Sequence, residues 1–145
     1  MTLVYWDTML FTYWFKGQSP CDAQVEAIYN RMQERGDRLC TGIITVAELL
    51  VVPEKAGDSK RRDDLLKFFD QSDIDVLPFD IATAKAFAKI RASSNAKAPD
   101  AIHLACAATA GVDLFLTNDK ALRKLVVPGI GFIDDLNTTI LGLSP

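Results

Sequence analysis

Residues 100–117, DAIHLACAATAGVDLFLT, bring a helix and a strand together in one short stretch. The apolar and small residues at 100–110 predict a helix, and Gly111 is the residue type that commonly follows a helix C-terminus. Residues 114–117 then predict a short strand. A helix that leads directly into a strand is the repeating unit of proteins with a parallel sheet. This stretch therefore indicates an α/β fold.

The same alternation extends from this stretch to both ends of the sequence. It predicts a central parallel sheet with right-handed crossovers. Residues 93–97 resemble a flexible connector but are too short to divide the chain, so we expect one domain over residues 1–145. Ser59 is expected to cap the helix at 59–71. The predicted strands are 2–7, 39–44, 74–79, 114–117 and 130–133, and the predicted helices are 8–16, 21–35, 46–52, 59–71, 81–93, 100–110 and 119–125.

The composition limits the class of protein. The chain has 145 residues, of which 49% are hydrophobic, and this is enough for a core that needs no disulfide bonds. Its 16 basic and 19 acidic residues give a net charge of −3, whereas nucleic-acid-binding proteins usually carry a basic excess. A nucleic-acid partner would therefore have to meet a local basic surface or be held through metal ions.

The cysteines and the apolar runs indicate the cellular compartment of the protein. Cys21, Cys40 and Cys106 are odd in number and form no C-x-x-C pair. We expect Cys40 and Cys106 to be buried as small hydrophobic residues, which suits a reducing compartment. The apolar start of the chain is interrupted by Asp7 and lacks a basic region, and no later uncharged run is long enough to span a membrane. We therefore expect a cytoplasmic protein.

Five acidic residues are predicted at helix starts on one edge of the sheet. In an open α/β sheet, ligands bind at the carboxyl ends of the strands, near the point where the strand order reverses. Each acid also has a structural explanation, either as a helix cap or as a negative charge near a positive helix end. Glu48, for example, completes a T-x-x-E capping box with Thr45. The five acids are Asp7, Glu48, Asp80, Asp100 and Asp119.

Taken together, such acids form a candidate metal site. Clustered carboxylates raise one another's pKa through repulsion, and a divalent cation would relieve that repulsion. Mg²⁺ and Mn²⁺ prefer oxygen ligands, and no Cys/His set with zinc spacing competes for the assignment. The spacing alone does not select four of the five acids, because Asp80 also begins a helix after a strand.

Four motifs make the sequence resemble a PIN domain, in particular the VapC-like toxin ribonucleases of bacterial toxin–antitoxin pairs. They occur in order over nearly the whole chain, and the third is the most specific. Met9 departs from the first motif, because the family usually has Asn or Ser at this position. The motifs are VYWDT at 4–8, TVAEL at 45–49, KAPDAIHLA at 97–105 and LTND at 116–119.

The resemblance implies a three-layer α/β/α fold whose parallel sheet has the strand order 3-2-1-4-5. This order places Asp7, Asp100 and Asp119 beside the switch point and Glu48 one strand away. Asp80 follows the outer strand and is therefore assigned as a helix cap. The resemblance further implies that the other three aspartates coordinate Mg²⁺ or Mn²⁺, with Glu48 either as a further ligand or as the residue that orients the attacking water.

The reaction implied by the resemblance is metal-dependent hydrolysis of RNA phosphodiester bonds, which leaves a 5′-phosphate and a 3′-hydroxyl. Thr117 is implied as a hydroxyl that supports the acids. A toxin of this kind would be inhibited by a small antitoxin protein, and we expect a homodimer. The alternative is a non-catalytic or housekeeping PIN-type module that binds RNA or protein. A receiver domain, a haloacid dehalogenase and a P-loop enzyme are disfavoured, because none of their motifs occurs.

Four further features have functional or structural interpretations. His103 shares a helix face with Asp100, and we expect a packing or hydrogen-bonding role for it. Lys85 and Lys89 also share a helix face and are candidates for binding RNA phosphates. The basic run at 60–62 is predicted to be solvated surface, although it opposes the dipole of its helix. The aromatic residues at 11–15 exceed what one short helix normally buries, so some could contact an antitoxin helix or a second copy of the chain.

Overall fold

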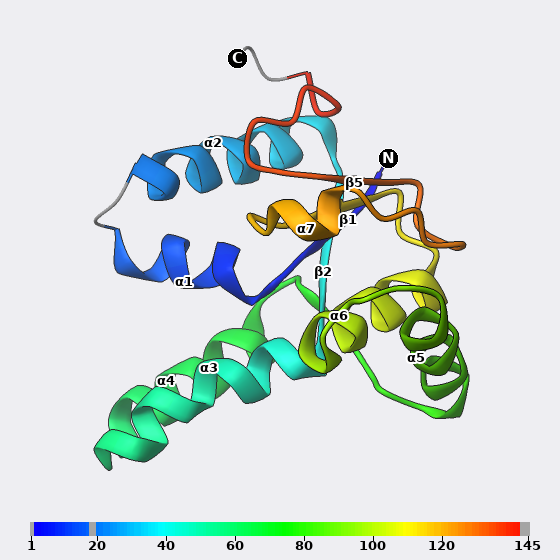
Figure 1. Ribbon diagram of the computed structural model, residues 1–145. Helices are drawn as coiled ribbons and strands as arrows, with labels where there is room; N and C mark the ends of the chain where they lie inside the picture. The colour runs from blue at the N-terminus through cyan, green and yellow to red at the C-terminus, as the bar shows by residue number, and fades with distance from the viewer. Residues whose placement is uncertain (1, 18–19, 143–145) are drawn as a thin grey trace.

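The computed structural model describes residues 2–17 and 20–142, and a five-stranded parallel sheet lies at its centre (Figure 1). The strand order is β3-β2-β1-β4-β5, which confirms the α/β fold and the strand order expected from the sequence. β1 pairs with both β2 and β4, so the strand order reverses between β1 and β4. The strands are β1 (Leu3–Trp6), β2 (Arg38–Gly42), β3 (Asp75–Leu77), β4 (Leu114–Leu116) and β5 (Phe132–Asp134).

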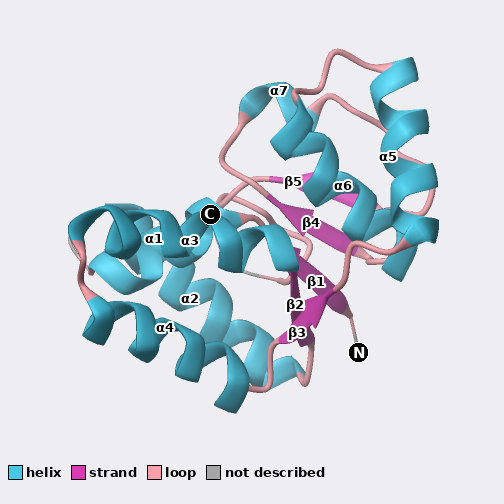
Figure 2. Ribbon diagram, turned by 90° about the horizontal axis from the view of Figure 1, so that it is seen from below, coloured by secondary structure: helices cyan, strands magenta, loops and turns pink. Residues whose placement is uncertain are grey.

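Helices cover both faces of the sheet, as Figure 2 shows. Helices α1 to α4 pack over one hydrophobic cluster, and α5, α6 and α7 pack over the other. The three layers therefore have two separate cores with the sheet between them. The helices are α1 (Thr8–Lys16), α2 (Pro20–Arg35), α3 (Ile43–Ala56), α4 (Ser59–Gln71), α5 (Ile81–Ser93), α6 (Ala98–Ala110) and α7 (Lys120–Arg123).

The two central strands supply side chains to both cores. In β1, Val4 and Trp6 belong to the cluster under α1 to α4, whereas Tyr5 belongs to the cluster under α5 to α7. In β4, Leu114 and Phe115 divide in the same way. Successive strand residues point to opposite faces, so a strand that is covered on both faces must be apolar at every position. This explains why these strands have no polar alternation.

The cysteines are free thiols, and their burial agrees with the sequence prediction for Cys40 and Cys106. Burial raises the pKa of the Cys40 thiol to about 12 and that of Cys106 to about 11. Both thiols therefore stay protonated near neutral pH and act as small apolar side chains. Within residues 2–17 and 20–142, every helix is too short or too polar to span a membrane.

Helix α3 differs most from its prediction. It is longer at both ends than the predicted 46–52, and the predicted capping box is wrong because Gly42 is the N-cap and Thr45 lies inside the first turn. The Thr45 hydroxyl instead lies 2.7 Å from the Thr41 hydroxyl. Pro53 removes one backbone hydrogen bond but does not end the helix, which continues to Ala56.

The start of α4 also corrects a prediction. Asp58, and not Ser59, is the N-cap, and its carboxylate accepts a hydrogen bond from the Arg61 backbone N–H at 3.0 Å. This negative charge at the positive helix end offsets the basic residues that follow. Lys60 and Arg62 form ion pairs with neighbouring carboxylates. Two of the three basic residues at 60–62 are therefore paired surface charges, and the third, Arg61, lines the groove between α1, α3 and α4.

Candidate metal-binding active site

Asp7 follows β1 at the carboxyl edge of the sheet and is 9% exposed. It is the N-cap of α1, and its Oδ1 accepts the Met9 backbone N–H at 3.1 Å. The Met9 side chain itself is exposed, so this residue supports Asp7 only through its backbone. Burial raises the pKa of Asp7, against the opposing effects of a Thr117 hydrogen bond and the His103 ring. Asp7 is thus held in a poorly solvated position at the switch point.

Asp119 follows β4, the strand next to β1. Its Oδ1 caps α7 by accepting the Ala121 backbone N–H at 2.9 Å, and its own N–H donates to Thr117 Oγ1 at 3.1 Å. Thr117 is fully buried, and its hydroxyl opposes the effect of burial on the pKa of Asp7. The Thr117 hydroxyl therefore acts on the acids that follow both central strands, and its supporting role stays a prediction.

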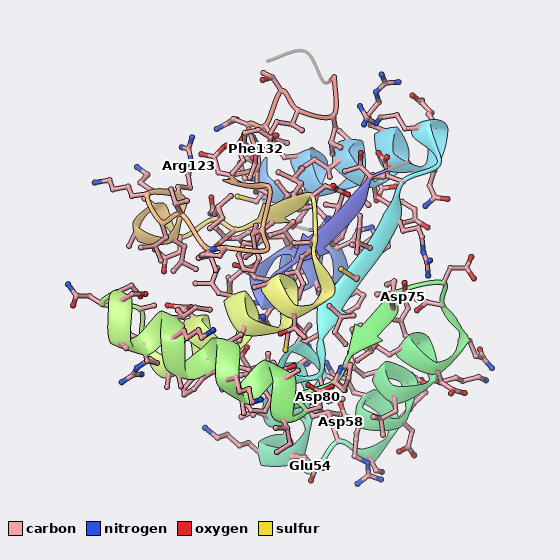
Figure 3. All side chains as sticks on the ribbon, turned by 90° about the vertical axis from the view of Figure 1, so that its right-hand side faces the viewer. Glu54, Asp58, Asp75, Asp80, Arg123 and Phe132 are labelled. Atoms are coloured by element: carbon pink, nitrogen blue, oxygen red, sulfur yellow. The ribbon has the colours of Figure 1, made fainter. Side chains whose placement is uncertain are left out.

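Arg123 ties α7 to the strand beside it. Its Nη2 lies 3.3 Å from Asp134 Oδ1 and its Nη1 lies 2.7 Å from Asp135 Oδ2. Figure 3 shows Arg123 near Phe132 of β5. Because Asp119 directly precedes α7, these ion pairs help to fix the position of its carboxylate.

Asp100 lies in the first turn of α6 and is half-buried. Burial raises the pKa of its carboxyl, and the negative charges of Asp119 and Glu48 raise it further. The His103 ring and Lys97 oppose this shift. Asp100 therefore experiences the charges of two other candidate acids, which come from different elements of the fold.

Glu48 lies in the second turn of α3, and its carboxylate turns toward α1 and α6. Thr8 Oγ1 donates a hydrogen bond to Glu48 Oε1 at 2.7 Å, and His103 Nε2 lies 2.9 Å from the same oxygen. The hydrogen bond with His103, followed by that with Thr8, lowers the pKa of Glu48. Glu48 is therefore kept ionised where the starts of α1, α3 and α6 meet (Figure 1).

The four carboxylates share a region, but their side chains do not converge on one point. Among the residues that the structure describes, no three His, Cys, Asp or Glu side chains are arranged to hold a metal ion. One oxygen each of Asp7, Glu48 and Asp119 is engaged by a hydrogen-bond donor of the chain itself. These side chains must therefore change rotamer before they can coordinate one metal ion together.

The chemistry of these acids nevertheless fits a divalent cation. All four offer hard oxygen ligands, which Mg²⁺ and Mn²⁺ prefer. The raised pKa of Asp7 and of Asp100 shows that burial and neighbouring anions disfavour their charged forms in the chain alone. A divalent cation would remove this disadvantage, because it attracts the same charges that now repel one another.

Two polar residues beside the acids were not identified from the sequence. Thr8 donates to Glu48, and the charge of Lys97 favours the ionised form of Asp100. A hydroxyl directly after a candidate ligand is a signal that could have identified Thr8. A lysine at the start of a helix is a signal for Lys97, because the helix dipole disfavours a positive charge there.

The other candidates lie on α5. Lys85 and Lys89 are exposed, and within the described part of the chain their ammonium groups form no hydrogen bond or ion pair, so their role in binding RNA stays a prediction. Asp80 is the N-cap of α5, and its Oδ1 accepts hydrogen bonds from Thr83 N at 3.0 Å and Thr83 Oγ1 at 2.9 Å. This confirms its assignment as a helix cap. Figure 3 shows it at the end of the molecule away from Arg123.

Metal-free protein should lose stability as the pH rises through the titration of Asp7 and Asp100. Their pKa values lie above the ordinary value of 3.8, so the folded chain binds these protons more tightly than the unfolded chain does. The resulting stabilisation is fully present below pH 3.8 and is lost as the pH rises through the raised values. Urea unfolding with chelator at a series of pH values measures this loss.

In that experiment, Asp7→Asn should reduce the loss, because asparagine does not ionise. Asp80→Asn is the matched control, since the pKa of Asp80 is lowered by hydrogen bonds from Thr83. Its stabilisation has the opposite sign, being present above pH 3.8 and lost as the pH falls through the lowered value. Identical pH profiles for wild type and Asp7→Asn would contradict the assignment.

The chain has recognisable relatives among solved structures. The VapBC2 complex from Rickettsia felis, solved with a promoter DNA fragment, gives a TM-score of 0.70 at 14% identity and covers 92% of this chain and 98% of that chain. A toxin–antitoxin complex from Klebsiella pneumoniae gives 0.61 at 20% identity, with 88% and 94% covered. FitAcB from Neisseria gonorrhoeae gives 0.64 at 23% identity, with 81% and 88% covered. These likenesses show a shared fold.

Sequence comparison gives a family. No curated protein matches the sequence significantly. The family model for the PIN domain, however, matches residues 4–127, which include most of β1, the strands β2 to β4 and all four candidate acids. This match covers most of the chain, and the strand order and the motif positions agree with it. The chain belongs to the PIN domain family.

Proposed function

We propose that the protein is a metal-dependent endoribonuclease that hydrolyses RNA phosphodiester bonds. The observation that carries this proposal is the placement of Asp7, Glu48, Asp100 and Asp119 at one sheet edge, where Asp100 is influenced by the charges of both Asp119 and Glu48. Such coupling of acids from separate elements is unfavourable for stability and is typical of functional sites. Membership of the PIN domain family, which typically comprises nucleases, supports the same function.

Each of the four acids would have a role in metal binding or in orienting the attacking water. Asp7, Asp100 and Asp119 would hold Mg²⁺ or Mn²⁺, with the Thr117 hydroxyl accepting the Asp119 backbone N–H and favouring the ionised form of Asp7. Once bound, the ion would supply charge stabilisation at the phosphate and a more acidic water. Glu48 is ionised and held in place by Thr8, so it can orient the attacking water or add a ligand. The products would carry a 5′-phosphate and a 3′-hydroxyl.

Incubation of the purified protein with structured RNA tests this function. We expect cleavage with Mg²⁺ or Mn²⁺, none with chelator, and fragments that carry a 5′-phosphate. RNA binding without cleavage at any metal concentration would favour the alternative, a non-catalytic PIN-type module. Cleavage that persists in chelator would contradict a metal-dependent mechanism.

We further propose that a small antitoxin protein occupies a groove beside the site. The groove has a volume of about 580 Å³ and opens between α1, α3 and α4, with Thr8 and Glu48 in its lining. Phe15 and Phe68 give it apolar walls, as the aromatic residues of segment 11–15 suggested. An apolar segment bound there would block access to Glu48. The toxin–antitoxin complex among the similar structures supports this kind of partner.

The product of a small open reading frame beside the gene should copurify with the protein and inhibit RNA cleavage. Phe15→Ser should weaken that inhibition about tenfold, because buried aromatic residues contribute much of an interface's binding energy. Phe132→Ser is the matched control, since Phe132 is 64% exposed on β5 and lies outside the groove (Figure 3). Equal inhibition of the two variants would contradict this placement of the partner.

A further inference from the structure

A chain of buried polar contacts leads from the backbone of β2 to Glu48. The Gly42 N–H donates to the Tyr5 hydroxyl at 2.9 Å, and that hydroxyl lies 2.7 Å from Nδ1 of His103. On the other side of the ring, His103 Nε2 lies 2.9 Å from Glu48 Oε1. Tyr5 is fully buried and His103 is 5% exposed, whereas the Glu48 side chain is 40% exposed. The contacts therefore run from the core to a carboxylate at the surface of the site.

The position of Tyr5 in this chain of contacts is fixed by packing. Its ring stacks on Phe115 with centroids 4.9 Å apart and an interplanar angle of 7°. A Cβ atom at position 42 would lie 2.6 Å from the Tyr5 hydroxyl oxygen, so the hydroxyl fills the space that glycine leaves open. The backbone of Gly42 has φ of −85°, which any residue can adopt. Space for the tyrosine hydroxyl, and not backbone conformation, explains the need for glycine here.

The hydrogen bonds around Tyr5 favour one tautomer of His103. The tyrosine oxygen already accepts the Gly42 N–H, so its own proton is available to Nδ1. Burial raises the pKa of Tyr5 well above the ordinary value of 10.0, and the hydroxyl therefore remains a donor at any physiological pH. With Nδ1 as an acceptor, the ring proton lies on Nε2, which then donates to Glu48.

We propose that Tyr5 and His103 are positioning residues that hold Glu48 in place for the nuclease reaction, an inference that rests on the proposed function. Among the described residues, the Tyr5 hydroxyl forms no hydrogen bond with the four acids and reaches Glu48 through the imidazole ring. Hydrogen-bond partners of carboxylate ligands restrict ligand orientation, and their loss typically costs metal affinity or activity. Both ring nitrogens of His103 have partners, Tyr5 at Nδ1 and Glu48 at Nε2, so the ring links the packed core to the acid.

The tautomer can be measured without any activity. His103 is the only histidine in the chain, so an imidazole ¹⁵N spectrum contains one ring. At alkaline pH, where an ordinary imidazole is neutral, we expect the Nε2-protonated tautomer in wild type. In Tyr5→Phe the ring should become a mixture of tautomers, because Nδ1 loses its donor. An unchanged ring spectrum in Tyr5→Phe would overturn the proposal.

The dependence of RNA cleavage on Mn²⁺ concentration tests the consequence for Glu48. His103→Gln keeps an amide donor where Nε2 lies, whereas His103→Asn reaches only the position of Nδ1. We expect His103→Asn to raise the Mn²⁺ concentration for half-maximal cleavage about tenfold, with a smaller change in the rate at saturating Mn²⁺. His103→Gln should behave like wild type. Both variants keep Tyr5, so they test the proposal even if Tyr5→Phe folds poorly.

Different results would overturn the positioning role of His103 and the proposed nuclease function. Equal Mn²⁺ requirements for His103→Gln and His103→Asn would overturn the positioning role, even if wild type cleaves RNA. Absence of cleavage by wild type would overturn the proposed nuclease, and with it the role of Glu48 as the positioned group. The ring spectrum would still decide whether Tyr5 sets the tautomer of His103.

Discussion

Replacement of Asp100 by asparagine should reduce metal-dependent RNA cleavage by about 10³-fold, which corresponds to about 4 kcal/mol of transition-state stabilisation. The amide has almost the same shape as the carboxylate but lacks the charge that would hold the cation. The stability of the metal-free fold should not fall, because the pKa of Asp100 is raised and its charge is unfavourable in the folded chain. Cleavage rates and thermal unfolding in chelator measure these two effects.

Asp80→Asn is the control for this prediction. Asp80 undergoes the same chemical change at the start of another helix, but it serves as a helix cap. Asparagine is a good N-cap, so both stability and cleavage should remain near wild type. An Asp100→Asn enzyme that cleaves RNA at the wild-type rate would contradict the site assignment. A large loss of cleavage in Asp80→Asn would show that the four acids were wrongly selected.

Gly42→Ala should lower the free energy of unfolding by about 2 kcal/mol, the usual scale for an extra methyl group in a packed core. The new Cβ would lie 2.6 Å from the Tyr5 hydroxyl oxygen and 3.2 Å from Cys106 Sγ. Tyr5 cannot move away easily, because it is fully buried and stacked on Phe115. Urea unfolding with chelator measures the loss without any contribution from bound metal.

A second substitution should recover most of this stability. In Gly42→Ala/Tyr5→Phe, the methyl group occupies the space that the hydroxyl leaves, so the double variant should be more stable than Gly42→Ala alone. The effects of two residues in contact are not additive, and a double-mutant cycle measures the coupling. Additive losses would show that the hydroxyl of Tyr5 does not fill the space at Gly42.

The sequence predicts the elements whose signals are local. Asp7, Asp80 and Asp119 all cap helices as expected, because a capping aspartate bonds a backbone N–H only two or three residues away. The continuous apolar runs of the central strands likewise follow from their own neighbours in the sequence. The strand order, in contrast, comes from the family resemblance, since no local signal determines which strands pair.

Residues whose partners are distant in sequence were harder to assign. Glu48 was given a capping role because Thr45 stands three residues before it, but its partners are Thr8, 40 positions away, and His103, 55 positions away. The fold alone brings these residues together. The hydrogen-bonding role expected for His103 agrees with the structure, although its link to Tyr5 could not be predicted. A homodimer stays a prediction.

Titration of metal-free protein with Mn²⁺, followed by the electron paramagnetic resonance signal of the free ion, measures whether these carboxylates bind a metal. We expect wild type and Asp80→Asn to bind Mn²⁺ and to release it when Mg²⁺ is added. Asp7→Asn, Asp100→Asn and Asp119→Asn should bind it at least about tenfold more weakly. Equal binding by all five proteins, or no binding by wild type, would contradict a metal site built from these carboxylates.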